Sequence, residues 1–268
     1  AAIFVVNQVS LDASETLQAK HKFERWARSQ NVPRIKGYRA DNAPFQSNLW
    51  KIDLAEKNQS IDYSGVGAHH QNGAAERAIQ TVTKWARAML IHMVLHWPDQ
   101  AHPDLWPFAL EHAAYIWNNM PKKDSKIAPL EILSGTKFPN HLALQRLHVF
   151  GCPTYVLDPK LQDGKKLPKW KPRSRRGVYL GYSPQHASSV ARILHPITGN
   201  VSPQYHYVCD DHFSTVPNVG TGGTPDPSFT DALWYCLVTS GDENIVESIF
   251  GDEGPPPIRD EWLTPEER

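Results

Sequence analysis

The stretches RADNAPF (residues 39–45) and GVGAHHQNGAAERAIQTVTK (residues 65–84) decide how the fold of this chain is interpreted. The first overlaps RIKGYRA (34–40), whose β-branched and aromatic residues predict a strand that ends at Asp41. In the second, the pair Asn72-Gly73 predicts a turn, and asparagine is a favoured helix N-cap. The end of a strand is thus expected first, and the start of a helix after it.

The helical pattern begins close to Glu76. Apolar residues recur there at about 3.6-residue spacing, namely Ala75, Ile79, Val82, Ala86, Met89, Leu90 and Met93. Because a strand end and a helix start can lie side by side, we expect the carboxylates of Asp41 and Glu76 to converge. Mg²⁺ prefers carboxylate oxygens, and paired metal ions stabilise the attacking and leaving oxygens of a phosphoryl transfer. These two acids are the candidate catalytic and metal-binding residues.

The same motifs resemble those of a known family. Asp41-Asn42 resembles the second acidic motif of retroviral-type integrases, and HQNGxxER at residues 70–77 resembles the third. The match is closest to the Ty1/copia class of LTR retrotransposons, although Ala43 stands where that family usually has glycine. It continues through LWPFALEHAAYIWNNMP (105–121), HVFGCPTYVLDP (148–159) and PRSRRGVYLGYS (172–183), and so covers residues 1–216.

The resemblance implies a DNA strand-transfer enzyme with an RNase-H-like core. Such an enzyme uses water and then a 3′-OH to attack phosphodiesters under Mg²⁺ or Mn²⁺, held by three acids. The first of those acids lies on an upstream strand that this sequence does not contain. Asp12 could replace it, but Asp12 precedes an apolar stripe of helical spacing and is interpreted as a helix cap. The chain is therefore predicted to be a polyprotein fragment that is inactive alone, while the complete enzyme forms a homo-oligomer.

Two groups of residues are candidates for DNA binding. By their spacing from Glu76 along the helix, Lys84 and Arg87 are placed to hold a phosphodiester, as is Asn72 before it. The most basic stretch of the chain supplies Lys165, Lys166, Lys169, Lys171, Arg173, Arg175 and Arg176. Its prolines predict a non-helical segment, and each cation that neutralises a phosphate adds affinity. The alternative for both groups is an ordinary solvated surface.

The net charge of zero conceals an uneven distribution along the chain. Residues 1–216 carry twenty-six Lys and Arg against seventeen Asp and Glu, a net +9, whereas residues 217–268 carry a net −9. A basic body suits a polyanionic partner, and an acidic segment rich in Pro and Gly suits a disordered linker. Three scattered cysteines suggest reduced thiols, and the lack of a long apolar run suggests no membrane span. We expect an intracellular protein, in the nucleus or in a cytoplasmic virus-like particle.

The expected fold class is α/β. We expect strands at 2–11, 34–40, 59–65 and 151–158, helices at 13–30, 44–59, 73–93, 104–119 and 127–135, and alternating strands and turns through 176–213. In the fourth of those helices, Trp106, Leu110, Ala113, Ala114 and Trp117 form the stripe expected to pack on the core. These elements divide into a partial RNase-H-like core (1–135), a basic linker with a small antiparallel β-barrel-like module (136–216) and the acidic linker (217–268).

Two other functions fit the same residues. One is a catalytically inactive remnant that binds DNA or chromatin, and the other is a cellular nuclease of the same fold. The nuclease is disfavoured because GVYLGYS (177–183) resembles integrases specifically. His92 and His96 have the spacing of a zinc pair, but the residues between them lack the glutamate of HExxH, and no third ligand is evident. Zinc is therefore not predicted.

Overall fold

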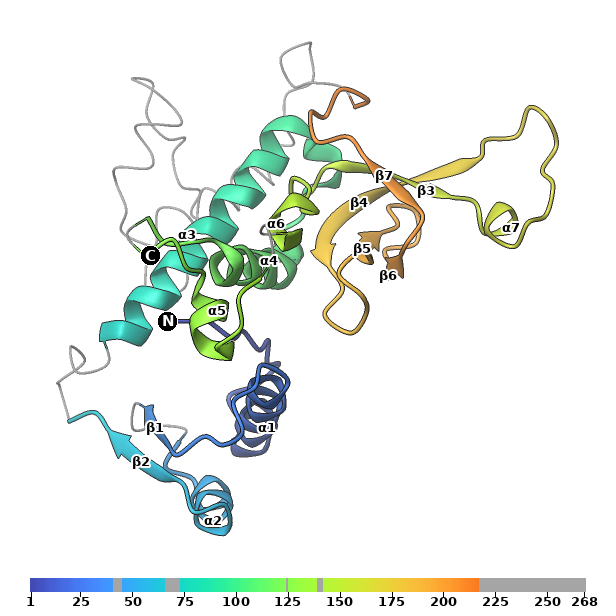
Figure 1. The fold of residues 1–268 in the computed structure, drawn as a ribbon. Coiled ribbons are helices and arrows are strands. Elements are labelled where there is room, and N and C mark those ends of the chain that lie inside the picture. The colour runs from blue at the N-terminus through green and yellow to red at the C-terminus, as the bar shows by residue number, and fades with distance from the viewer. Residues whose placement is uncertain (41–44, 66–72, 124, 139–141, 217–268) are drawn as a thin grey trace, which may run out of the picture. The chain divides into compact units, whose positions relative to one another are not determined.

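The computed structural model describes residues 1–40, 45–65, 73–123, 125–138 and 142–216 (Figure 1). The chain is a mixed α/β protein that divides into two compact units. The first unit combines Ala1–Ala86 with Leu110–Leu147, and the second combines Arg87–Ala109 with the residues from His148 onward. The predicted site residues Asp41 and Asn72, residues 66–71 before Asn72 and the acidic segment 217–268 lie outside the described residues. No helix in the described part is long and apolar enough to cross a membrane.

The N-terminal segment of the first unit is not the strand that was predicted for residues 2–11, and that prediction is wrong. The backbone of Ile3 is bonded by a side chain instead. Its N–H donates to Oδ1 of Asn118 at 2.7 Å, and its carbonyl accepts from Nδ2 of the same asparagine at 2.6 Å. Helix α1 (Ala13–Ser29) follows, with Asp12 at the predicted N-cap position but without a capping side-chain hydrogen bond.

A strand–helix–strand unit follows α1. Strand β1 (Gly37–Ala40), helix α2 (Asn48–Glu56) and strand β2 (Ser60–Tyr63) agree with three of the predicted elements. The Ser47 side chain accepts a hydrogen bond from the backbone of Trp50 and so caps α2. The two strands pair in parallel, as the intervening helix requires. The predicted α/β alternation is thus present in this unit (Figure 1).

Two longer helices contribute to both units. They are α3 (Gly73–His96) and α4 (Trp106–Asn119), and the short 3₁₀ turns η2 (Pro98–Gln100) and η3 (Pro103–Leu105) lie between them. In the first unit, Trp85 of α3 meets Trp117 of α4 edge-on at 5.7 Å between ring centroids. The expected stripe on α4 is right for Ala113 and Ala114, which are buried, but wrong for Trp106, which is 49% exposed.

The first unit ends with two short helices. Helix α5 (Pro129–Ser134) agrees with the prediction, and Gly135 ends it in the left-handed region at φ 67°. The carboxylate of Glu131 accepts the backbone N–H groups of Ala128 and Phe138, both at 2.8 Å. Helix α6 (Leu142–Gln145) then leads to the second unit.

The second unit contains a five-stranded antiparallel sheet in the order β6-β5-β4-β3-β7. Its elements are β3 (Pro153–Leu157), α7 (Pro159–Gln162), β4 (Ser174–Tyr182), β5 (Ala191–Leu194), β6 (Val201–Gln204) and β7 (Tyr207–Cys209). The predicted small antiparallel module is thus confirmed as a sheet. Helix α7 corrects the expectation that prolines exclude a helix here, because Pro159 occupies the first helical turn, where no N–H partner is needed.

The start of the sheet packs against α3 within the second unit. Gly151, at φ 80°, donates its N–H to the carbonyl of Tyr179 at 2.8 Å. A Cβ at this glycine would lie 2.6 Å from Sδ of Met93, a side chain that is completely buried. Both the backbone conformation and the space therefore require glycine at this position.

We predict that Gly151→Ala lowers the free energy of unfolding by about 2–4 kcal/mol, since it combines a left-handed alanine with overpacking against Met93. Gly164→Ala is the matched control, because Gly164 has φ 72° but open space where the Cβ would lie. The control should cost only about 1–2 kcal/mol. Urea unfolding of both variants measures the difference, and equal losses would contradict the packing argument.

Candidate nucleic-acid interface

The loop between β3 and β4, residues 158–173, is called the basic loop below. Its base is closed by a hydrogen bond from the backbone N–H of Asp158 to the carbonyl of Arg173, at 2.8 Å. The carboxylate of Asp158 accepts the backbone N–H of Lys160 and starts α7. Further along, the N–H of Lys171 bonds the carbonyl of Pro168 at 3.1 Å and forms a tight turn. Local hydrogen bonds thus shape both ends of the basic loop.

The structure brings the predicted cations of the basic stretch together on the basic loop and the first residues of β4. All seven are exposed, namely Lys165, Lys166, Lys169, Lys171, Arg173, Arg175 and Arg176. The ammonium of Lys165 lies 3.5 Å from the carboxylate of Asp163, and an exposed ion pair of this kind contributes little to stability. A dense set of exposed cations creates a positive potential suited to a polyanion.

Arg175 and Arg176 differ from the lysines because they belong to a paired strand. Arg175 stands opposite Val156 and Arg176 opposite Tyr155 in the β3–β4 register. The guanidinium of Arg176 lies over the ring of Trp97 at 5.4 Å. Both arginines also line a hollow of about 320 Å³ whose other walls come from β3, β5 and β6. Planar guanidinium groups on a fixed backbone suit bidentate contacts to phosphate.

The hollow holds further polar groups. His195, Thr198, Asn200, Ser202 and Gln204 line it together with the arginines. The Nδ1 atom of His195 is buried and has no hydrogen-bond partner among the described residues. A phosphate oxygen entering the hollow would meet donors on several sides.

The predicted acidic site is described only at Glu76. This residue lies in the first turn of α3 and is half-buried. Its convergence with Asp41 stays a prediction, because Asp41 lies outside the described residues. Lys84 is exposed and Arg87 half-buried, about two and three turns further along α3. Among the described residues, no group of three or more His, Cys, Asp or Glu side chains forms a metal-binding cluster.

The first unit contains a buried charge network that the sequence interpretation missed. The Lys20 side chain is fully buried, and its ammonium donates to Glu24 at 2.7 Å and also to Asp53. Lys57 lies 2.9 Å from Glu24, and Gln59 donates to the same carboxylate at 3.0 Å. The i,i+4 spacing of Lys20 and Glu24 was the available sequence signal.

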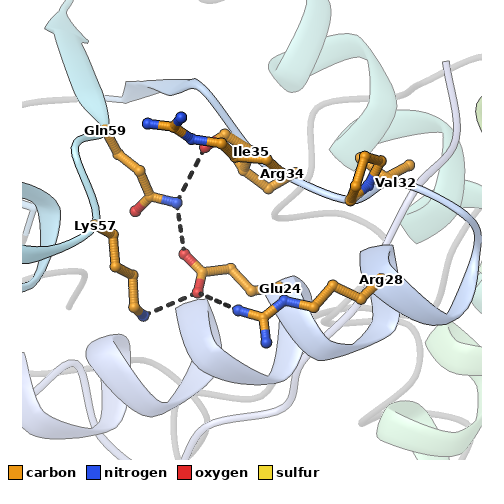
Figure 2. A pocket seen from close by; sticks show the side chains of 8 residues that line it. Glu24, Arg28, Val32, Arg34, Ile35, Lys57 and Gln59 are labelled. Carbon is orange, nitrogen blue, oxygen red and sulfur yellow. Dashed lines mark hydrogen bonds and ion pairs between the residues drawn. The ribbon is translucent and has the colours of Figure 1, made fainter.

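A pocket of about 220 Å³ opens beside this network (Figure 2). Glu24, Arg28, Lys57 and Gln59 line it, and Figure 2 shows their side chains directed toward one another. Burial alone would raise the pKa of Glu24, but hydrogen bonds from Lys20, Lys57, Gln59 and Tyr38 lower it to about 2. The carboxylate is already satisfied by the protein's own donors, so the network is structural and does not act as a general base or metal ligand.

A second missed cluster joins the two ends of the β module. Nδ1 of His148 lies 2.9 Å from Asp211, and Asp211 also accepts the backbone N–H of Val149 at 2.8 Å. A hydrogen bond with Cys209 and the nearby Asp211 raise the pKa of His148 to about 9. Cys152 and Cys209 are both free thiols, whereas Cys236 lies outside the described residues.

His92 and His96 stack on each other, with ring centroids 4.1 Å apart, and both contact the ring of Phe213. Nδ1 of His96 donates to the backbone carbonyl of His92. The pair is therefore part of the packing around the end of α3.

Comparison with protein-family models and with curated proteins finds no match to this chain. Inference about function therefore depends on the motifs and on the geometry of the described residues.

We predict that Lys20→Met destabilises the protein by about 3–5 kcal/mol, because it removes the fully buried cation between two buried carboxylates and leaves them only the half-buried Lys57 as a shared cation. Lys22→Met, on an exposed position of α1, is the control and should change stability by less than about 0.5 kcal/mol. Glu24 has a lower pKa in the folded protein, about 2, than in the unfolded chain, where it is about 4.3. Its ionised carboxylate therefore stabilises the fold fully at pH values above about 4.3, and this stabilisation is lost as the pH falls toward 2. Urea unfolding at several pH values should show this acid-dependent loss in the wild type and a smaller one in Lys20→Met.

Proposed function

We propose that this chain binds DNA as part of a DNA-integration enzyme related to the Ty1/copia retrotransposon integrases. The observation that carries the proposal is the set of seven exposed Lys and Arg side chains on the basic loop and the start of β4. The order of the integrase-like motifs along residues 1–216 supports it independently. The parallel pairing of β1 and β2 across α2 is compatible with an RNase-H-like core.

Binding through the basic loop would be mainly electrostatic. Each Lys or Arg that neutralises a phosphate releases counterions, so affinity falls steeply as salt rises and depends little on base sequence. The lysines act as mobile point charges, whereas Arg175 and Arg176 present planar donors from a paired strand. The proposed interface thus combines adjustable contacts on the loop with fixed contacts at the sheet.

Catalysis in the complete enzyme would depend on Asp41 and Glu76 as ligands of Mg²⁺ or Mn²⁺. The half-buried position of Glu76 at the start of α3 is compatible with that role. Such an ion would polarise the phosphodiester and favour the attacking oxygen. Asn72, Lys84 and Arg87 would position the DNA, and a homo-oligomer would hold the element ends and the target DNA together.

An inactive DNA- or chromatin-binding remnant is the second candidate. The exposed cations of the basic loop support this candidate as well as the integration enzyme, because phosphate binding on the loop requires neither a metal ion nor the carboxylates of Asp41 and Glu76. Activity of an extended chain distinguishes the two.

We predict that Lys165→Gln/Lys166→Gln reduces the slope of log affinity against log salt by about two for duplex DNA, since two phosphate contacts are removed. Lys22→Gln/Lys51→Gln removes the same charge from exposed positions of α1 and α2 and should leave the slope unchanged. Titration of labelled duplex at rising salt measures both. Equal slopes in the two variants would contradict the role of the basic loop.

We predict that the chain alone does not join an oligonucleotide end to target DNA in Mn²⁺, because two carboxylates leave a second metal ion poorly held. A version extended upstream to restore the family's first Asp should join, and Asp41→Asn or Glu76→Gln in it should abolish joining. Joining by the unextended chain that is lost on Asp41→Asn would contradict this prediction. An extended chain that binds DNA but never joins would favour the inactive remnant.

A further inference from the structure

The basic loop has one aromatic side chain, that of Trp170, and it is 89% exposed. Tryptophan offers a large apolar surface with a polar N–H at its edge, and it is enriched where proteins contact a partner. The two other large apolar residues of the basic loop, Leu161 and Leu167, are half-buried and so partly covered by the protein. Within the described residues, most of the Trp170 surface is thus uncovered.

The local backbone holds this ring outward. The N–H of Lys171 bonds the carbonyl of Pro168 at 3.1 Å, so Lys169 and Trp170 are the two central residues of a tight turn. The ammonium of Lys169 lies 5.3 Å from the centre of the Trp170 ring and occupies one side of it. The short turn and the cation orient the indole, while most of its surface stays open.

The chemistry around the ring indicates what would cover it. Lysines precede and follow Trp170 directly, and Lys165 and Lys166 lie on the same loop, all exposed. An aromatic face between ammonium groups matches the alternation of base and phosphate along a nucleic-acid strand. Stacking on an aromatic side chain requires an open base face, which bases inside a duplex do not offer.

We propose that Trp170 is a stacking platform for an unpaired nucleic-acid base, with the flanking lysines on the adjacent phosphates. This inference rests on the proposed function, because it assumes that the basic loop meets nucleic acid. It adds the form of nucleic acid that the loop prefers, which is a single strand or a duplex with an unpaired end.

A membrane surface is the other partner whose chemistry a tryptophan among lysines matches. It is disfavoured here because insertion into lipid needs several apolar side chains on one face. On the basic loop Trp170 is flanked by charged residues on both sides, and Leu161 and Leu167 are partly covered. Binding to lipid is therefore an outcome that the test must be able to reveal.

The experiment compares binding of the full chain to a blunt duplex, the same duplex with a single-stranded overhang, and single strands of DNA and of RNA. Trp170→Ala should weaken binding to the overhang and to the single strands by at least about fivefold and leave the blunt duplex unchanged. Trp170→Phe should retain most of the affinity, because it keeps an aromatic face. Trp106→Ala removes another exposed tryptophan, outside the basic loop, and should have no effect.

Equal affinity of Trp170→Ala and wild type for every probe would overturn the inference. If Lys165→Gln/Lys166→Gln still weakened duplex binding, the proposed function would stand without it. Failure of the wild type to bind any nucleic acid at low salt would overturn both. The remaining arm of the experiment measures binding to vesicles of phosphatidylserine and phosphatidylcholine. If Trp170→Ala abolished vesicle binding and left nucleic-acid binding unchanged, the ring would be assigned to a membrane contact and the inference overturned. If Trp170→Ala weakens binding to the RNA and DNA strands by similar factors, the result supports stacking on the base. The relative affinities of the wild type for the two strands show whether ribose or deoxyribose is preferred.

Discussion

The first unit depends on one fully buried ammonium group, that of Lys20, held between the carboxylates of Glu24 and Asp53. A buried charge is tolerated only where opposite charges and hydrogen bonds replace its water. Glu24 shares its helix with Lys20, but Asp53 comes from α2, and Gln59, just before β2, also accepts from the ammonium. This contact, together with the contacts of Lys57 to the same two carboxylates, fixes α1 against α2 and the entrance to β2. The parallel strand pair that leads toward the predicted acids is positioned by these contacts.

In the second unit, the arrangement of the sheet and the basic loop depends on β4, whose residues change from exposed to buried along the strand. Its first residues, Ser174 to Arg176, are half-buried or exposed, whereas Gly177–Leu180 are buried. A Cβ at Gly177 would lie 2.4 Å from the side chain of Ile193, so β5 approaches the backbone of β4 closely there. The buried part anchors the strand in the sheet, and the exposed part carries the arginines and continues into the basic loop. The rigidity of the proposed interface comes from this continuity.

Local signals in the sequence were enough for much of the fold. The Gly135 stop and the long apolar period of α3 each lie within or beside the element that they define, and those elements are present. The predictions failed where the deciding partner is distant or the local rule has an exception. The backbone of Ile3 is bonded by Asn118, 115 residues away, and no local pattern contains that information. Pro159 begins a helix because the first helical turn needs no N–H donor.

The residues of the candidate site also differ in whether local sequence was enough to predict their role. The cations of the basic stretch were predictable, because they lie within twelve residues of one another and their exposure does not depend on distant partners. Lys20 was not, since its role requires Asp53, 33 residues away, whereas a surface lysine would look identical in the sequence. The same residue type thus serves two opposite purposes, and the proposed phosphate-binding role requires both exposure and neighbouring cations. A lysine surrounded by protein acceptors has no capacity left for a phosphate, while Lys169, Lys171 and their neighbours remain solvated and available to a polyanion. Charge density alone therefore does not identify the proposed interface, and the basic loop differs from the Lys20 network in that its charges are exposed.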